Sequence, residues 1–190
     1  MSSISLITGG GRSGKSSFAE KLAAEASAKR QTGVLYVATG LAIDEEMTDR
    51  IARHRAARPK DWITWERYRG FADIERELKN GGFGVILLDC IAGLLMGILF
   101  EESPNADDCT IEQFERVEAL SIAEIDEICS YAKRQDNDLI LVTNEIGMGV
   151  IPETRYSRLY RDALGRINIH SAKVADKVVL MVAGLPVMLK

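Results

Sequence analysis

The sequence predicts an α/β fold in which helices flank a mostly parallel central sheet. Short apolar runs recur along the chain, and segments with helical periodicity lie between them. Each run is nearly all apolar, which is typical of strands buried on both faces, and alternation with helices is typical of parallel βαβ units. We expect strands at Ile4–Thr8, Val34–Thr39, Val85–Asp89, Leu139–Thr143 and Val178–Ala183, and helices at 15–30, 44–57, 71–79, 111–134 and 154–174.

The carboxyl ends of these strands are expected to form the ligand-binding edge, because ligands of open parallel sheets collect where the strands end. The segments that follow the first four strands are rich in glycine, hydroxyl and carboxylate side chains. We expect them around one edge of the sheet, at Thr8–Ser16, Thr39–Glu46, Asp89–Cys90 and Thr143–Gly149.

The length of 190 residues predicts one domain over residues 1–190. A net charge of −4 gives no general attraction to nucleic acid or to an anionic membrane, so we expect neither as a partner. The longest apolar stretch, near Cys90–Phe100, is shorter than the roughly 18 residues that a membrane span needs, and no secretory signal is recognisable. Cys90, Cys109 and Cys129 lack metal-ligand or redox spacing. We therefore expect reduced thiols and a cytoplasmic protein.

A phosphate-binding loop follows the first strand. Residues 9–16 read GGGRSGKS and match the pattern GxxxxGK[ST] in full, between an apolar strand and a helix. Glycines let backbone N–H groups turn inward around a phosphate, and the helix N-terminus adds partial positive charge. Lys15 would act on the β- and γ-phosphates, and Ser16 would bind Mg²⁺, as in the P-loop NTPase type of fold. The predicted phosphate contacts are Gly9, Gly10, Gly11, Arg12, Ser13, Gly14, Lys15 and Ser16.

Asp89 is the second predicted metal ligand. In the run Val85–Asp89, four apolar residues precede a carboxylate, which would emerge at the end of a buried strand, where it can bind Mg²⁺. The alternative is that Asp89 caps the helix that follows.

The segment from Asp44 to Pro59 predicts an anion site. Its acidic residues come first and its basic residues last, as a helix dipole prefers, and Pro59 disfavours helix at Arg58. Arg50, His54 and Arg58 are spaced four apart, which places them close to one face. The surrounding positive charge would keep His54 neutral near pH 7, and a neutral imidazole beside a triphosphate can be a nucleophile. The alternative is a solvated helix end whose histidine has no catalytic role.

Two other features are interpreted as structural. His170 is late in an amphipathic helix, where packing or a helix-end role is expected. Trp62 and Trp65 alternate with Ile63 and Thr64, which favours packing in the core.

The motifs together resemble those of a known family. They read TGGGRSGKSSFAE at 8–20, LYVATG at 35–40, DEEMTDRIARHRAARPKDWITWE at 44–66, VILLDC at 85–90, LVTNEIGMGVIPETRYSRLYRDALGRIN at 141–168 and ADKVVLMVAGLPVMLK at 175–190. Their order and spacing resemble those of the bifunctional adenosylcobinamide kinase / adenosylcobinamide-phosphate guanylyltransferases of cobalamin biosynthesis, over essentially the whole chain.

The resemblance implies two reactions. Enzymes of this family phosphorylate the aminopropanol hydroxyl of adenosylcobinamide with a nucleoside triphosphate, ATP or GTP. They then transfer GMP from GTP to that phosphate through a guanylylated histidine, which His54 matches, to give adenosyl-GDP-cobinamide. The resemblance also implies a cytoplasmic homotrimer. The further nucleotide contacts that it implies are Ala38, Thr39, Gly40, Arg55, Ala56, Ala57, Arg58, Glu66 and Asp89.

The chain departs from the family pattern in three places. Ala92 and Gly97 stand where the family often has Thr and Asn, and Ile169 replaces the Gln of an Asn-Gln pair. The departures keep open a second hypothesis, a P-loop small-molecule kinase without guanylyl transfer. A third is a GTP-dependent switch, but such proteins read guanine with Asn-Lys-x-Asp, and the segment Thr143–Glu145 lacks both the Lys and the Asp.

Overall fold

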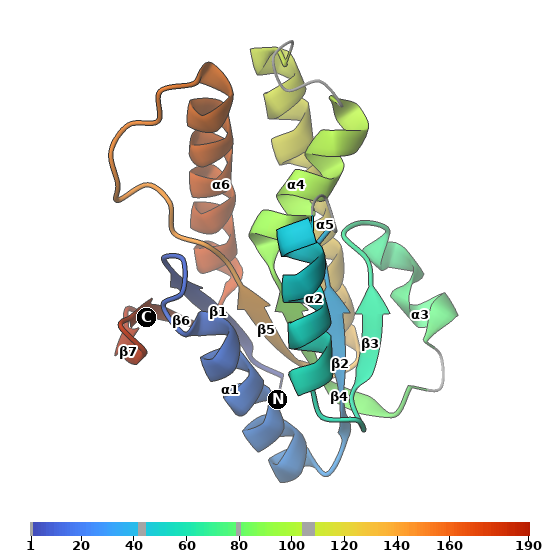
Figure 1. Cartoon of the computed structure of the whole chain (residues 1–190). Coiled ribbons are helices and arrows are strands. Elements are labelled where there is room, and N and C mark those ends of the chain that lie inside the picture. Colours follow the sequence, from blue (N-terminus) through green and yellow to red (C-terminus); the bar gives the residue numbers. More distant parts are fainter. Residues whose placement is uncertain (1, 42–44, 79–80, 104–108) are drawn as a thin grey trace.

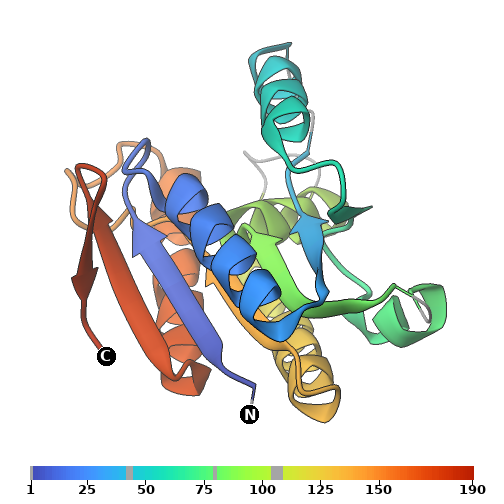
Figure 2. The same cartoon turned by 90° about the horizontal axis from the view of Figure 1, so that it is seen from below.

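The computed structural model describes residues 2–41, 45–78, 81–103 and 109–190. Within these ranges one sheet has the strand order β3-β2-β4-β5-β1-β6-β7, with helices on both of its faces (Figures 1 and 2). All neighbouring strands are parallel except β6 and β7. The fold is therefore the predicted α/β fold of the P-loop NTPase type. The strands are β1 Ile4–Gly9, β2 Gly33–Ala38, β3 Ile63–Glu66, β4 Phe83–Asp89, β5 Asp138–Val142, β6 Lys177–Val182 and β7 Leu185–Met188. The helices are α1 Lys15–Arg30, α2 Glu45–Ala57, η1 Phe71–Asp73, α3 Ile74–Glu77, α4 Ile91–Glu102, α5 Ile111–Arg134 and α6 Arg155–Val174.

Alternate residues of each central strand enter two separate cores. In β4, Val85 and Leu87 pack on the side of α1, whereas Ile86 and Leu88 pack on the side of α4, α5 and α6. Figure 2 shows the same division, with α1 on one face of the sheet and α4, α5 and α6 on the other. Because both faces of the central strands are covered, the strands are apolar throughout, as their sequences predict.

Helix α4 was not predicted from the sequence. Its residues Ile91–Glu102 are almost all apolar and most are buried, so the run has no polar face from which a helical period could be recognised. Gly93 and Gly97 further weaken the helical signal. The helix forms because it is buried between the sheet and α5.

Strands β3 and β7 were also absent from the prediction. β3 has only four residues, and the side chain of Trp65 is buried whereas that of Glu66 is exposed. β7 is an exposed edge strand that contains Pro186. The predicted helix at 71–79 is replaced, over its described part, by η1 and the four residues of α3. None of the helices in the described ranges is long and apolar enough to span a membrane.

Polar contacts fix the positions of several elements. Glu124 of α5 accepts hydrogen bonds from the backbone N–H groups of Gly70 (2.8 Å) and Phe71 (2.9 Å) and so anchors the turn after β3. His170 of α6 lies 2.7 Å from Asp126 of α5, which agrees with its predicted packing role. At the end of α6, the Nζ of Lys190 donates to the carbonyls of Ala172 (3.2 Å), Lys173 (3.5 Å) and Ala175 (2.6 Å).

Candidate active site

The phosphate loop lies between the end of β1 and the start of α1. Gly14 is the N-cap of α1 with a left-handed φ of 89°, a conformation that glycine adopts without the clash of a Cβ. A Cβ at Gly9 would lie 2.7 Å from the backbone oxygen of Met181. The Nζ of Lys15 donates to the carbonyl of Gly10 at 3.0 Å. The loop thus has the compact turn and helix start that its sequence predicts.

Two other segments hold this loop. The backbone N–H of Gly184, in the β6–β7 turn, donates to the carbonyl of Ser13 at 3.0 Å, and the N–H of Glu145, after β5, donates to the carbonyl of Gly9 at 3.0 Å. A Cβ at Gly14 would lie 3.3 Å from the Cα of Gly184. The conformation of the loop therefore depends on segments from distant parts of the sequence.

The predicted ligand-binding residues of β2, β3 and β4 lie in register at the carboxyl edge. Ala38 is paired with Glu66 on one side and with Asp89 on the other. Thr39 is 1% exposed. Its hydroxyl donates to the carbonyl of Cys90 at 2.6 Å and accepts from the N–H of Cys90 at 2.7 Å. The Thr39 side chain thus joins the ends of β2 and β4 and does not face the pocket.

Asp89 is oriented by a buried tyrosine. The hydroxyl of Tyr36, whose side chain is buried, donates to Oδ2 of Asp89 at 2.8 Å. Burial, together with the negative charge of Asp89, raises the pKa of Tyr36 well above its ordinary value, so the phenol stays protonated. The guanidinium carbon of Arg58 lies 3.7 Å from the centroid of the Tyr36 ring, which is a close cation–π contact. The Nε of Arg58 is buried and has no hydrogen-bond partner among the described residues.

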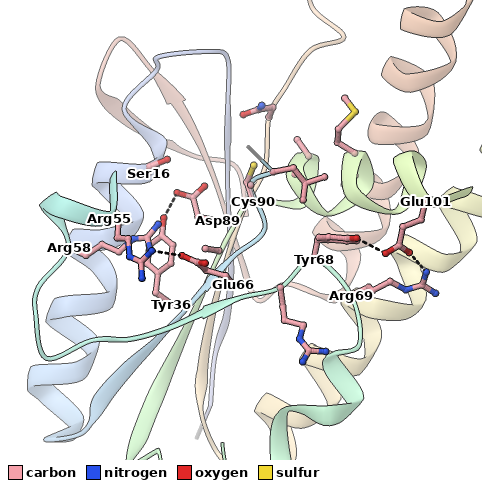
Figure 3. Close-up of a pocket in the computed structure, with 18 of the residues that line it drawn as sticks. Ser16, Tyr36, Arg55, Arg58, Glu66, Tyr68, Arg69, Asp89, Cys90 and Glu101 are labelled. Atoms are coloured by element: carbon pink, nitrogen blue, oxygen red, sulfur yellow. Dashed lines mark hydrogen bonds and ion pairs between the residues drawn. The ribbon is translucent and has the colours of Figure 1, made fainter. Parts of the chain in front are cut away.

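These residues line a pocket of about 790 Å³ (Figure 3), a size typical of small-molecule sites. We call one end of it the phosphate end, lined by Ser16, Tyr36, Arg58 and Asp89. Beyond Cys90 the pocket continues to Tyr68, Arg69 and Glu101 (Figure 3). The lining residues are Ser16, Tyr36, Ala38, Gly40, Leu41, Arg55, Arg58, Glu66, Arg67, Tyr68, Arg69, Asp89, Cys90, Ala92, Gly93, Met96, Glu101, Asn144 and Tyr160.

Helix α2 lies on the side of α1 and projects away from the sheet (Figure 2). Arg55 forms an ion pair with Glu66 across 3.4 Å, and Arg55 and Arg58 both line the pocket. Ala56 is exposed. The side chains of His54 and Ala57 lie outside the described part of the structure, although their positions on α2 are described. The predicted role of His54 therefore stays a prediction.

The structure brings seven of the residues predicted for the site into one pocket. Ser16, Ala38, Gly40, Arg55, Arg58, Glu66 and Asp89 line one pocket. Sequence reasoning missed the far end, where Tyr68 and Arg69 follow β3 and Met96 and Glu101 belong to α4. Recognition of β3 would have revealed Tyr68 and Arg69, because side chains just after a strand lie at the carboxyl edge.

Cys90 lies between the two ends of the pocket. Burial and the nearby charge of Asp89 raise the pKa of the Cys90 thiol to about 11. The thiol is therefore protonated near neutral pH, which argues against a role as a nucleophile because the thiolate is the reactive form.

A phosphate loop, a helix N-terminus and a strand-end carboxylate at one sheet edge define the chain as a P-loop nucleotide-binding protein. The same fold occurs in a KaiC-like protein of Pyrococcus horikoshii, with a TM-score of 0.51 and 13% identity, over 94% of this chain and 70% of that one.

Residues 5–189 match the cobinamide kinase / cobinamide phosphate guanyltransferase family. The chain belongs to this family and is an enzyme. It is 37% identical to the bifunctional adenosylcobalamin biosynthesis protein CobU of Escherichia coli, over 97% of this chain and 98% of that protein. The corresponding protein of Salmonella typhimurium is also 37% identical, over 97% and 98% of the two chains. CobP of Pseudomonas aeruginosa is 38% identical, over 97% and 96%.

Proposed function

We propose that this enzyme phosphorylates adenosylcobinamide and then transfers GMP from GTP to the phosphorylated product through a guanylylated His54. The observation that carries the proposal is a single pocket in which Arg55 of α2, and Arg58 just after that helix, lie with Ser16 and Asp89. Both reactions need a bound triphosphate, and both develop negative charge on phosphate oxygens, which arginines stabilise. Family membership supports the same pair of reactions.

In the first reaction, the phosphate loop of residues 9–16 holds the β- and γ-phosphates of ATP or GTP. The alcohol oxygen of adenosylcobinamide bonds to the γ-phosphorus, the bond to the bridging oxygen breaks, and the hydroxyl proton is released to solvent. Lys15 stabilises the transferred group. Ser16 and Asp89 both line the pocket, and a hydroxyl and a carboxylate are ligands that suit Mg²⁺. When bound, Mg²⁺ would neutralise charge on the phosphate oxygens.

In the second reaction, a ring nitrogen of His54 attacks the α-phosphorus of GTP and pyrophosphate leaves. A phosphate oxygen of adenosylcobinamide phosphate then attacks the same phosphorus, and the N–P bond breaks to free His54. Arg55 and Arg58, which line the pocket, would stabilise the departing pyrophosphate. The His54 step is supported by the motif around His54 and by Arg55 of the same helix, which lines the pocket.

The remaining predicted nucleotide contacts fall into two groups, those proposed to contact the nucleotide directly and Thr39, which does not face the pocket. Ala38, Gly40 and Glu66 line it and are proposed to contact the nucleotide directly, and Ala56 and Ala57 are proposed to do so from α2. Thr39 would act through its hydrogen bonds to Cys90, which fix the end of β2.

A homotrimer in the cytoplasm completes the proposal. Large apolar side chains are exposed on β7, at Leu185, Val187 and Met188, and on the loop before α6, at Met148 and Val150. Both segments lie on the β6–β7 side of the molecule (Figures 1 and 2). Exposed apolar patches of this kind are typical of subunit contacts. Sedimentation analysis would test the assembly, and a monomer at micromolar concentration would contradict it.

The test of the function uses GTP labelled at the α-phosphate, with Mg²⁺ and without corrinoid. After denaturation, we expect acid-labile, base-stable label on the wild-type protein and none on a folded His54→Ala variant. The variant is expected to keep the phosphorylation of cobinamide. Binding of GTP without label on the wild type would favour a kinase without guanylyl transfer, and label on the variant would show that another residue is the nucleophile.

A further inference from the structure

The pocket extends well beyond the phosphate end. We call the extension the acceptor lobe, and its walls are Tyr68, Ala92, Met96, Glu101 and Tyr160. Tyr68, Arg69 and Glu101 lie on the far side of Cys90 from Ser16 and Arg58 (Figure 3). The acceptor lobe therefore lies beyond Asp89 as seen from the phosphate loop.

The position of the acceptor lobe suits the attacking group of a phosphoryl transfer. The attacking oxygen must approach the γ-phosphorus opposite the leaving oxygen. The phosphate loop holds the leaving side, near Lys15 and Ser16, so the attacking group has to come from the side away from the loop. Asp89 lies between the two, where the reacting phosphate would be. The acceptor lobe is the part of this pocket that meets the requirement.

The lining of the acceptor lobe differs from that of the phosphate end. Arg69 and the hydroxyl of Tyr68 both donate to Glu101, so the carboxylate is fully paired at the rim. The hydrogen bond from Tyr68, with that from Arg69, holds the pKa of Glu101 below its ordinary value. A carboxylate paired with one guanidinium adds no net charge. Below the rim, Ala92 and Met96 give an apolar surface. The hydroxyl of Tyr160 donates a hydrogen bond to the carbonyl of Ala92 at 3.0 Å. Such a surface suits an uncharged organic group rather than a second polyphosphate.

Two glycines on α4 let other segments pack closely against the helix, and one of them, Gly97, makes room for Tyr68. Gly93, Gly97 and Glu101 are spaced four apart and lie on one face of α4. A Cβ at Gly97 would lie 2.5 Å from the ring carbons of Tyr68, which is a severe clash, and a Cβ at Gly93 would lie 2.5 Å from the hydroxyl of Thr39. The ring of Tyr68 therefore lies directly against the backbone of α4. Its position depends on the absence of a side chain at residue 97.

The segment that carries Tyr68 is also fixed at both ends. On one side, the N–H of Arg67 donates to the carbonyl of Ala38 at 3.0 Å, and its guanidinium donates to Glu77 at 2.8 Å. On the other side, Glu124 holds the N–H groups of Gly70 and Phe71. The wall is therefore present before any ligand arrives.

From these contacts we infer that the acceptor lobe binds the alcohol-bearing arm of the cobinamide acceptor, and that Tyr68, seated on Gly97, is a specificity-determining wall of that subsite. The inference rests on the proposed function for the identity of the acceptor. Residue 97 is also one of the positions where this chain departs from the family pattern. The packing of Tyr68 against α4 is therefore possible because residue 97 is a glycine.

The test measures acceptor binding separately from nucleotide chemistry. Calorimetry gives the Kd of adenosylcobinamide for the wild type, Gly97→Ala, Tyr68→Phe and Tyr68→Ala, in the presence of a non-hydrolysable GTP analogue. Labelling by GTP without acceptor is measured on the same proteins. Gly165→Ala is the matched control, because a Cβ at Gly165 of α6 would meet nothing within 4 Å.

We expect Gly97→Ala and Tyr68→Ala to raise the Kd for adenosylcobinamide about ten- to a hundredfold, as for other misplaced walls of small-molecule sites. Tyr68→Phe keeps the ring and should have a much smaller effect. GTP labelling should be unchanged in all variants, and Gly165→Ala should match the wild type in both assays. Thermal unfolding checks that Gly97→Ala is folded, and Tyr68→Ala provides the same test without an added Cβ.

Failure of the inference and failure of the proposed function give different results. Unchanged acceptor Kd in both Gly97→Ala and Tyr68→Ala would overturn the inference, whatever the labelling. Absence of acceptor binding by the wild type would overturn it as well. A third result is possible, in which the wild type binds the acceptor and the variants bind it more weakly, but GTP does not label the wild type. This result would refute guanylyl transfer through His54 and would leave the acceptor subsite supported.

Discussion

Replacement of Tyr36 by Phe tests whether Asp89 acts in catalysis through its orientation. The change removes one atom, the hydroxyl that donates to Asp89 at 2.8 Å, and keeps the ring on which Arg58 lies. Because Tyr36 is 1% exposed, water cannot readily take the place of its hydroxyl. The Asp89 carboxylate then loses a fixed donor and gains rotational freedom at the point where it would bind Mg²⁺.

A hydrogen bond to a charged group contributes about 1.5–3 kcal/mol, and Asp89 is only partly buried, so we take the lower bound. If that energy is lost from the transition state, kcat for phosphorylation of cobinamide falls about tenfold. The free energy of unfolding should fall by about the same 1.5 kcal/mol. Since the pKa of Tyr36 is raised by burial, the hydrogen bond should persist up to at least pH 9 in the wild type.

The assay is steady-state phosphorylation of cobinamide over a range of Mg²⁺ concentrations, with urea unfolding of the same proteins. Ser121→Ala is the control, because it removes a buried hydroxyl that donates to Val117 at 2.8 Å within α5, away from the pocket. The control should lose stability without loss of kcat. If Tyr36→Phe keeps wild-type kcat and Mg²⁺ dependence in a folded protein, then Asp89 does not act through the orientation that Tyr36 imposes.

Three further predictions concern stability and reactivity. Burial opposes ionisation of Asp138, but hydrogen bonds from Arg30 (2.7 Å) and Ser3 (2.8 Å) outweigh it and hold the pKa of Asp138 below its ordinary value. A lowered folded pKa stabilises the protein above the unfolded pKa of about 3.9, and this contribution is lost as the pH falls through the folded value. Asp138→Asn should therefore be less stable at pH 7 and lose less stability than the wild type on acidification below pH 4, as followed by urea unfolding; equal pH dependence would refute this. Lys190→Met removes the donor to the last carbonyls of α6 and should lower the free energy of unfolding by about 0.5–1 kcal/mol, measured by thermal unfolding. Burial raises the pKa of Cys129 to about 12, so mass spectrometry should find Cys129 unmodified after iodoacetamide at pH 8 unless the protein is first unfolded.

Local sequence was sufficient for the parts of the site that lie within one segment. The phosphate loop could be predicted because its glycines, Lys15 and Ser16 are adjacent in sequence and their conformation follows from the strand and helix on either side. Asp89 could be placed because it ends an apolar strand. The edge at which these residues meet followed from the parallel order of the strands.

The acceptor lobe could not be predicted because its residues come together only through tertiary packing. The same limit applies at the phosphate end, where Tyr36 was included in an apolar strand and nothing local indicates that its hydroxyl reaches Asp89. Tyr68 follows a strand too short to recognise, and Met96 and Glu101 belong to a helix without a polar face. The role of Gly97 depends on a ring that packs against it from another segment.

The hydrogen bond between the β6–β7 turn and the phosphate loop has a consequence for the protein during its translation. Ser13 is made early and Gly184 late, yet one hydrogen bond joins them. A nascent chain therefore carries the complete loop sequence long before it contains the turn that supports the loop. We expect tight nucleotide binding to appear only after β6 and β7 have left the ribosome, so that a growing chain is kept from binding nucleotide before its sheet is complete.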